Sequence, residues 1–465
     1  MSLSRVKGKR SLSQQMSQAI SPLMESLENR QMLSAGLIQR FVDTDGDLVK
    51  VRIINGGTVD TIDPVTRNIE LSGTGINSLL NITVQRAAGG DGLVTLGEIR
   101  CDGPMLAING PSADITHEIS INDLNQPVSP ANKVSINLGA LVGVAMYTGT
   151  LIGQRISTLQ LADWSRQAAG QELNAPSIDT FIITGRADVP GTPANESLPG
   201  NSGEAMFIGD SSTDANTFSV GTMSIAGSLG DVQATGRLGS ITAWTIYGQL
   251  SASTYGTIKA VRATGEILAT GTPGVPEAIS SINITGKVTT LRIATNQDAI
   301  GQISIGARAL NLTVVSAKGL SSLTVGQSLD GSRIQTHNMV GFIQVGGMSD
   351  TAIQVGVARD FTGIATSAAD FAKPGATLQN FVVTGIIGQA PTTSWVTGTN
   401  VLSLPRVGTM KLRNVDSPES LQIFVLDAGS PTLVRYMDSP NPSANFLWQP
   451  GNPLPSMLTV MLHHV

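Results

Sequence analysis

One short phrase returns ten times between residues 178 and 412 of this chain. It consists of an apolar or aromatic residue, a spacer that is usually Gly or Ser, one variable residue, and two apolar residues separated by one position. The copies occupy residues 178–183, 220–225, 238–243, 255–260, 279–284, 300–305, 320–325, 340–345, 378–383 and 407–412. Alternating apolar positions predict a strand with one buried and one solvated face. A strand repeat with a period of about 20 residues is typical of a β-solenoid, in which each copy is one rung stacked on the last.

The spacing of the copies supports this interpretation. The first residue of each apolar pair falls at positions 223, 241, 258, 282, 303, 323 and 343, with steps of 18, 17, 24, 21, 20 and 20. Two larger steps, 42 residues from Phe181 to Met223 and 38 from Ile343 to Phe381, are each close to two periods. We therefore expect a degenerate rung with an inserted loop in each gap. The polar positions show no consistent chemistry from copy to copy.

The composition fits a narrow, elongated coil. Glycine accounts for 51 of 465 residues, aromatic residues for 4% and charged residues for 14%, so small and β-branched side chains must fill the interior. The predicted fold is all-β, a single-stranded parallel β-helix with rungs about 4.8 Å apart and a short N-terminal helical or disordered segment. Such a coil grows without a new core for every 150 residues or so, and one long domain is expected.

The chain divides into segments of different character. We expect irregular solenoid strands already between residues 65 and 165, and a short helix in the alanine-rich stretch 358–377. The segments are an N-terminal sorting segment (1–35), an irregular solenoid start (36–188), an inserted loop (189–216), the regular solenoid (217–357), an insert (358–377), the final rungs (378–439), and a proline-rich tail with a closing strand (440–465). The tail between Pro440 and Pro455 should be extended coil, and residues 454–462 should form the closing strand.

Charge and hydropathy exclude two classes of partner. The net charge is −5, and no run of Lys or Arg lies beyond the first ten residues. A nucleic-acid-binding protein would normally carry a basic face. The apolar run 454–462 is far shorter than the roughly 20 residues that a membrane-spanning helix requires. We expect neither a nucleic-acid partner nor a membrane span.

Reactive side chains are few. Cys101 is the single cysteine, so an intrachain disulfide is excluded, and a lone Cys in an apolar strand is more often a small buried side chain than a nucleophile. The histidines, His117, His337, His463 and His464, are too dispersed for a metal site or a catalytic triad. No catalytic residue is predicted.

A segment near the N-terminus matches a family pattern. Its matching residues are Leu27, Glu28, Arg30, Met32, Leu33, Ser34 and Ala35, while Asn29 stands where the pattern has proline. The segment resembles the LEPR-XLL motif of large repeat-containing planctomycete surface proteins. The resemblance implies an exported or surface-associated protein whose N-terminal segment acts in sorting. The alternative is a short amphipathic helix that caps the first rung.

An acidic turn follows at Asp43, Asp45 and Asp47. Carboxylates that alternate with small residues in a tight turn are typical oxygen ligands of Ca²⁺, and these three are the predicted calcium ligands. An EF-hand is excluded, because Leu48 and Ile54 occupy the loop positions that require Gly and Glu. The alternative is an Asp-Gly turn between strands at 37–42 and 48–54. These strands also resemble the first strand pair of LEPR-XLL proteins.

Two function classes remain. The favoured one is an exported or cell-surface structural or adhesive protein without catalytic activity, which presents its loops or associates with other copies or other surface proteins. The alternative is a parallel β-helix that binds or cleaves polysaccharide, which needs carboxylates clustered on one face. An excess of cations can form a positive stripe for an acidic polymer, and the alternative is scattered, solvated side chains on outward strand positions. The region between residues 215 and 345 has eight Lys and Arg against five acids. Its acids, Asp231, Glu266, Glu277, Asp298 and Asp330, occupy different phases of the repeat.

Overall fold

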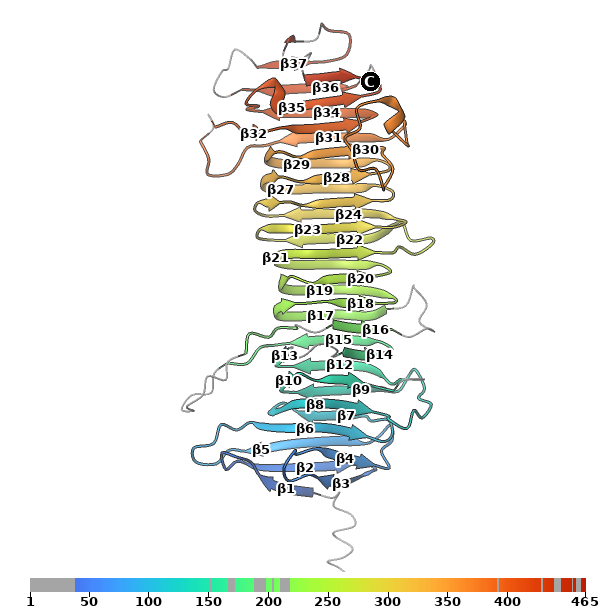
Figure 1. Ribbon diagram of the computed structural model, residues 1–465, viewed down its shortest axis with the longest axis vertical. Helices are drawn as coiled ribbons and strands as arrows, with labels where there is room; N and C mark the ends of the chain where they lie inside the picture. The colour runs from blue at the N-terminus through green and yellow to red at the C-terminus, as the bar shows by residue number, and fades with distance from the viewer. Residues whose placement is uncertain are drawn as a thin grey trace, which may run out of the picture.

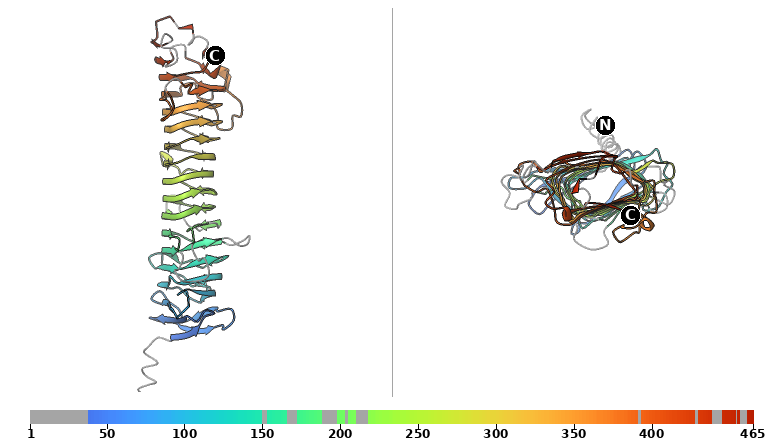
Figure 2. Two further views of the ribbon diagram at one scale, coloured as in Figure 1. Left: turned by 90° about the vertical axis from the view of Figure 1, so that its left-hand side faces the viewer. Right: turned by 90° about the horizontal axis from the view of Figure 1, so that it is seen from above.

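The chain forms a long rod of stacked β-coils, seen here in a computed structural model (Figure 1). The structure describes residues 38–465 except 150–152, 166–171, 188–197, 203–204, 210–217, 391–392, 428–429, 439–444, 454 and 457–460. The predicted sorting segment, residues 1–35, lies outside the described residues. Viewed along the rod, the coils superpose as a flattened ring (Figure 2). The prediction of an all-β solenoid is confirmed.

Each coil contributes strands to three sides of the rod. Side 1 contains the ten copies of the repeated phrase, and its strands pair in parallel from one coil to the next. Its strands are β5 (Leu79–Gln85), β7 (Ala107–Gly110), β9 (Lys133–Leu138), β12 (Arg155–Leu161), β15 (Ile178–Ile183), β17 (Phe218–Leu229), β19 (Arg237–Ile246), β21 (Tyr255–Ala269), β22 (Glu277–Ile284), β24 (Ala299–Ile305), β27 (Leu320–Asp330), β29 (Val340–Ser349), β31 (Thr377–Val383), β34 (Arg406–Arg413) and β36 (Leu433–Met437).

Sides 2 and 3 complete the coil. Side 2 is short. Most of it is formed by the ends of long strands that continue from side 1 or into side 3. The strands that lie on side 2 alone are β10 (Ala140–Val142), β13 (Asp163–Ser165), β25 (Ala309–Leu310) and β32 (Val396–Thr397). Side 3 contains β4 (Ile69–Ser72), β6 (Val94–Cys101), β8 (Ala113–Ile121), β11 (Ala145–Tyr147), β14 (Glu172–Ala175), β16 (Ala205–Ile208), β18 (Val232–Ala234), β20 (Gln249–Ala252), the second half of β21, β23 (Val288–Thr295), β26 (Thr313–Ser316), β28 (Arg333–Thr336), β30 (Ala352–Val355), β33 (Asn400–Leu404), β35 (Leu421–Val425) and β38 (Leu462–His464).

The ten copies lie in one register on side 1. The first apolar residue of each pair is the direct partner of the same residue in the next copy, from Phe181 to Met410. This register also crosses the two long gaps, because Phe181 pairs with Met223 and Ile343 with Phe381. The expectation of a hidden rung in each gap is therefore wrong. The extra residues lengthen the connections of a single coil.

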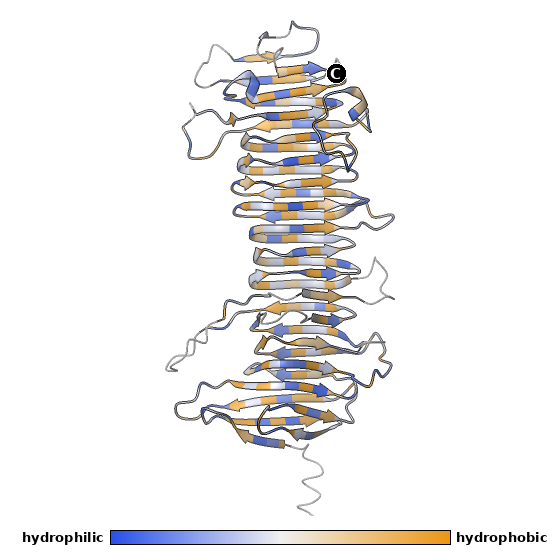
Figure 3. Cartoon of the chain, viewed as in Figure 1, coloured by the Kyte–Doolittle hydropathy of each residue, from blue (hydrophilic) through white to orange (hydrophobic). Residues whose placement is uncertain are grey.

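The core is a set of apolar columns that run along the rod. The side 1 column begins before the recognisable repeat, because Leu80, Ile108, Ile136 and Leu159 stack in register below Phe181. All five are fully buried, or within 1% of it. The prediction of solenoid strands between residues 65 and 165 is thus confirmed. Apolar and polar residues alternate along the strands (Figure 3), which places one set inside and the other on the surface.

Antiparallel strands close the N-terminal end. The sequence predicted β1 (Ile38–Val42) and β2 (Leu48–Ile54), and these pair with each other, while β2 pairs with β5 along its whole length. β3 (Thr58–Ile62) likewise pairs antiparallel with β4 and covers its edge. These pairings cover the backbone groups of the first coil, which would otherwise form an exposed sheet edge.

The C-terminal end differs from its prediction. The expected extended coil 440–455 contains β37 (Phe446–Trp448), which pairs antiparallel with β36. The expected closing strand 454–462 lies partly outside the described residues, and the strand that the structure shows there, β38, begins only at Leu462 and pairs in parallel with β35. The exposed position expected for His463 and His464 is confirmed.

The two insertions also differ from their predictions. Residues 189–216 contain a side 3 strand, β16, and most of the remaining loop lies outside the described residues. Residues 358–377 contain only a 3₁₀ turn, η1 (Ala368–Asp370), in place of the expected short helix; a second one, η2 (Pro418–Ser420), precedes β35. The insert folds over side 3, where the Arg333 guanidinium donates to the carbonyl oxygens of Phe361 and Thr362 at 2.6 and 2.9 Å.

Candidate functional site

The acidic turn between β1 and β2 is a closed hydrogen-bonded loop. Oδ1 of Asp43 accepts hydrogen bonds from the backbone N–H groups of Asp45, Gly46 and Asp47, at 3.2, 3.1 and 2.8 Å. The N–H of Asp43 donates in turn to the carbonyl oxygen of Asp47 at 3.0 Å. The alternative interpretation of this segment, a tight turn between two strands, is confirmed.

Asp47 is buried and already has partners. Its Oδ1 accepts from the N–H of Ala87 and its Oδ2 from the N–H of Gly92, each at 2.5 Å. A Cβ atom at Gly90 would lie 1.8 Å from Oδ1 of Asp47, so this loop approaches the carboxylate so closely that only glycine fits. Asp47 therefore anchors the connection 86–93 between sides 1 and 2, 40 or more residues further along the chain.

A hydrogen bond between the other two carboxyl groups shifts their pKa values in opposite directions. Burial, followed by a hydrogen bond with Asp45, raises the pKa of Asp43 to about 6. The same hydrogen bond lowers the pKa of Asp45, whose Oδ2 accepts from the N–H of Asp91 at 2.8 Å. The three acids each offer an oxygen within 4.8 Å of the others. A Ca²⁺ ion could therefore bind Asp43 once that carboxyl is deprotonated, but Asp45 and Asp47 would have to share oxygens that already accept hydrogen bonds.

Two arginines lie beside the turn. Asp43, Asp45 and Asp91 line a hollow of about 240 Å³ together with Arg67 and Arg186. The Arg186 guanidinium forms a bidentate ion pair, because it donates to both carboxylate oxygens of Asp114 at 2.9 Å. The hollow therefore has a mixed charge, and the calcium site stays a prediction.

The acidic side chains of the regular region form ion pairs or hydrogen bonds. Lys318 binds Asp298 at 2.6 Å, Arg308 binds Asp330 at 2.5 Å, and Glu277 accepts from the hydroxyl of Ser321 at 3.2 Å. Asp231 accepts from the N–H of Gln249 at 2.7 Å, and Gln249 pairs with Glu266. Asp231 and Glu266 thus lie in one outward column of side 3, two coils apart. The expectation that all five acids occupy different positions of the repeat is therefore wrong for Asp231 and Glu266.

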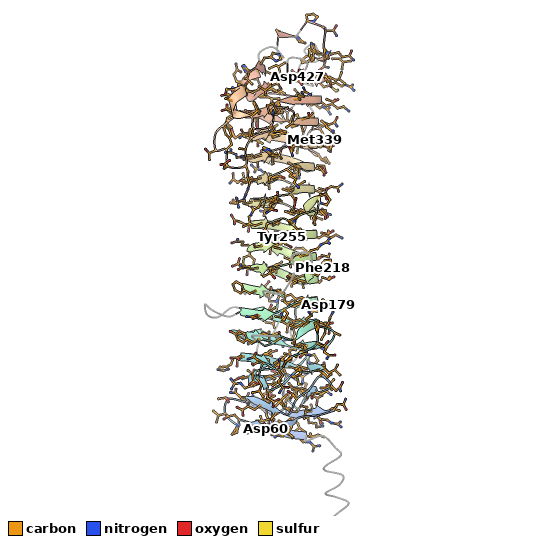
Figure 4. The ribbon with its side chains drawn as sticks, turned by 90° about the vertical axis from the view of Figure 1, so that its right-hand side faces the viewer. Asp60, Asp179, Phe218, Tyr255, Met339 and Asp427 are labelled. Atoms are coloured by element: carbon orange, nitrogen blue, oxygen red, sulfur yellow. The ribbon has the colours of Figure 1, made fainter. Side chains whose placement is uncertain are left out.

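Three basic residues of the same region line up, whereas others are scattered. Ala263 pairs with Val288 and Val288 with Ala309, so the exposed residues that precede them, Arg262, Lys287 and Arg308, lie in one column on side 2. Lys259 lies on side 1, Arg262 on side 2 and Arg292 on side 3, where it approaches Glu266 to 3.8 Å. Arg237 lies over the ring of Phe218, 4.8 Å from its centroid. Figure 4 labels Phe218, Asp179 and Met339 along this edge of the rod. The surface around the middle coils therefore carries a short basic column on side 2, in which Arg308 also binds Asp330, and scattered basic residues elsewhere.

Sequence reasoning missed a hollow on side 3. It measures about 230 Å³ and lies on the outer surface of β16, β18 and β20, lined in part by Phe207, Asp231 and Gln249. Phe207 belongs to the stretch 189–216 that was expected to be loop. The alternation of Met206 and Ile208 on either side of Phe207 was the available signal, although a strand of four residues is short.

Cys101 is a structural residue. It is fully buried, and desolvation, followed by the nearby charges of Asp123 and Asp102, raises the pKa of its thiol. A thiol that stays protonated is a poor nucleophile. The sequence-based interpretation of Cys101 as a small buried side chain agrees with this position.

Comparison of the chain with family models, with curated proteins and with solved structures finds no match. Within the described residues, no helix has the length and apolar character needed to cross a membrane. The surface of the rod is therefore the part of the molecule that points to a function.

Proposed function

We propose that this chain is an exported, cell-surface structural or adhesive rod without catalytic activity, and that side 1 is its contact surface. The observation that carries the proposal is a continuous column of hydroxyl and amide side chains on the outside of side 1. The column contains Thr158, Thr180, Thr222, Ser240, Thr257, Ser281, Gln302 and Ser322, paired one to the next.

The geometry of side 1 favours contact with another surface. The side chains of this column are exposed or half-buried, most of them are short, and the Ser281 hydroxyl donates to Oγ1 of Thr257 at 3.3 Å. A second column begins with Asn81, Asn109 and Asn137, and the Asn137 amide donates to Oδ1 of Asn109 at 3.1 Å. The long connections leave the coil at its edges (Figure 1), so side 1 stays flat. A flat surface rich in donors and acceptors suits contact with other polar surfaces.

The closed interior supports a structural role as well. The inner columns are filled by apolar side chains from Leu80 to the C-terminal coils, and the acids described above serve ion pairs and backbone hydrogen bonds. The proposal of export depends on the resemblance of residues 27–35 to the LEPR-XLL motif. Those residues lie outside the described part of the chain.

Fractionation of native cells combined with protease treatment of intact cells tests the proposal. We expect the chain in the surface fraction and accessible to added protease, and a purely cytosolic pool would contradict export. The double substitution Thr222→Lys and Thr257→Lys should release the protein from the cells by placing two charges on side 1. Thr313→Lys, on side 3, is the matched control and should leave retention unchanged.

A further inference from the structure

We propose that the hollow on side 3 binds one sugar ring of a neutral polysaccharide. Its lining consists of Phe207, Asp231, Gln233, Gln249 and Ser251, with Met206 and Val232 at its base. This inference goes beyond the proposed structural role and does not depend on export.

The strand register places an aromatic ring beside an amide and a hydroxyl. Phe207 pairs with Gln233, and Gln233 pairs with Ser251, so the three side chains form one outward column across three successive coils. The inward neighbours Met206 and Val232 are buried to within 1% and fix this orientation. Successive members of the column are about 4.8 Å apart, which lets one small ligand touch all of them.

Phe207 is an exposed ring on a solvated strand face. Its exposed fraction is 38%. An aromatic face carries partial negative charge, so it attracts the slightly positive C–H groups on one side of a sugar ring. A flat, exposed phenylalanine next to hydrogen-bonding groups is therefore a suitable platform for a sugar.

The polar groups around the ring are free to bind a ligand. The side chains of Gln233, Gln249 and Ser251 form no hydrogen bond with any other residue that the structure describes, and Asp231 uses Oδ1 alone, for the N–H of Gln249 at 2.7 Å. Two amides, one hydroxyl and one carboxylate oxygen remain as donors and acceptors. Sugar hydroxyl groups both donate and accept, and this set can satisfy both roles.

Charge and size define the ligand class. Asp231 is the charged residue of the lining, and it would repel carboxylate or sulfate groups at close range. The nearest guanidinium along the neighbouring column, that of Arg292, lies beside Glu266 at 3.8 Å. A volume of about 230 Å³ is below the roughly 300–1,000 Å³ of pockets for larger ligands. One uncharged ring fits this space, and the open strand face lets the polymer continue on both sides.

Affinity electrophoresis of the purified chain tests this proposal. Native gels would contain dextran, glucomannan or a soluble mixed-linkage β-glucan, with alginate as the acidic comparison. We expect at least one neutral polysaccharide to retard the wild-type chain and alginate to leave its mobility unchanged. Phe207→Ala should weaken the retardation about fivefold to tenfold, because the stacking contact is lost. Gln233→Ala should weaken it less.

The control is a phenylalanine of similar exposure elsewhere. Phe218 is 45% exposed at the edge of the rod (Figure 4), and Phe218→Ala should bind as the wild-type chain does. The proposal is overturned if none of the three neutral polysaccharides retards the wild-type chain, or if Phe207→Ala and Phe218→Ala weaken retardation equally. Either result leaves the proposed structural role intact, since that role is tested by the location of the protein in cells.

Discussion

The middle of the rod and its N-terminal end bury their strands in different ways. Between β17 and β30, each strand is covered by the equivalent strand of the next coil, in parallel and in register except at local bulges. At the N-terminal end, β1, β2 and β3 pair antiparallel and no repeat is present. Apolar columns hold the middle together. At the end, apolar side chains of β2 join the same core, and a buried aspartate adds hydrogen bonds to backbone groups 40 or more residues away.

This comparison shows what repetition supplies and what it leaves out. A repeated apolar pair needs no long-range specificity, because any copy can stack on any other. An end must have a single partner, and the chain achieves this with polar groups that are satisfied by particular backbone N–H groups. Substitutions in the two regions should therefore differ both in size and in how far their effects spread.

The largest effect is expected in an apolar column of the middle coils. Ile303 is 1% exposed and stacks between Ile282 and Leu323. Ile303→Ala should lower the free energy of unfolding by about 2–5 kcal/mol through lost burial and the cavity left behind. Ser304→Ala, on the outward face of the same strand, should change it by less than about 0.5 kcal/mol. Urea denaturation of both variants measures the difference, and equal effects would contradict the column as the source of stability.

A smaller loss is expected where two coils approach each other closely. A Cβ atom at Gly301 would lie 2.1 Å from the carbonyl oxygen of Ser280 in the preceding coil. Gly301→Ala should therefore destabilise the rod by about 1–3 kcal/mol, because the coils must separate locally. The control is Gly375→Ala, since nothing lies within 4 Å of a Cβ atom there. Thermal denaturation should leave the control at or slightly above the wild-type midpoint.

At the N-terminal end, the effect should be local. Asp47→Asn replaces a carboxylate oxygen that accepts from Ala87 or Gly92 by an amide NH₂, which leaves one donor without an acceptor. We expect a loss of about 1–3 kcal/mol in the protection of these amides from hydrogen exchange. Amides of the middle coils should keep their protection. Asp60→Asn, at an exposed carboxylate, is the control, and equal loss of protection there would argue against the anchoring role of Asp47.

The smallest effect is the pH dependence of the acidic turn. The pKa of Asp43, raised from 3.8 to about 6, means that the folded turn holds this proton more tightly than the unfolded chain does. The stability that the proton adds is fully present below pH 3.8 and is lost as the pH rises through about 6.

Ca²⁺ binding requires that both Asp43 and Asp45 are deprotonated. The predicted calcium site therefore implies calorimetric heat with millimolar Ca²⁺ at pH 7.5, less heat at pH 5, and none for Asp43→Asn. Absence of heat at pH 7.5 would end the calcium prediction.

The sequence predicts the middle of the rod much better than its interruptions. Residues such as Met223 and Ile303 carry the period, so both the strands and their inward faces could be predicted from the sequence. The direct contact of Phe181 with Met223 could not, because a spacing of 42 residues does not distinguish an extra rung from a long connection. The chemistry of the outward positions also emerged only with the register. Thr222, Ser240 and Thr257 become one hydroxyl column once their partners are known.

The candidate sites show the same limit. The acidic turn was recognisable from Asp43, Asp45 and Asp47, but the role of Asp47 depends on N–H groups at Ala87 and Gly92, which no local pattern indicates. Phe207 was hidden because β16 has four residues inside a long insertion, where a period of two is hard to detect.

A disulfide cross-link across the first long gap tests the central claim most directly, namely that the apolar and hydroxyl columns are continuous along the rod. Thr180 and Thr222 are paired neighbours on the outside of side 1. Their Cα atoms should lie about 4.8 Å apart, within the roughly 4.4–6.8 Å that a disulfide spans. The native Cys101 is buried and should not interfere. Thr180→Cys combined with Thr222→Cys should form an intrachain disulfide on mild oxidation, identified by mass spectrometry of the linked peptides.

The control pair, Thr180→Cys combined with Ser240→Cys, lies two coils apart and should form no disulfide. A rung hidden in the gap would place Thr180 and Thr222 about 9.6 Å apart, and failure of the first pair to cross-link would contradict the continuous columns.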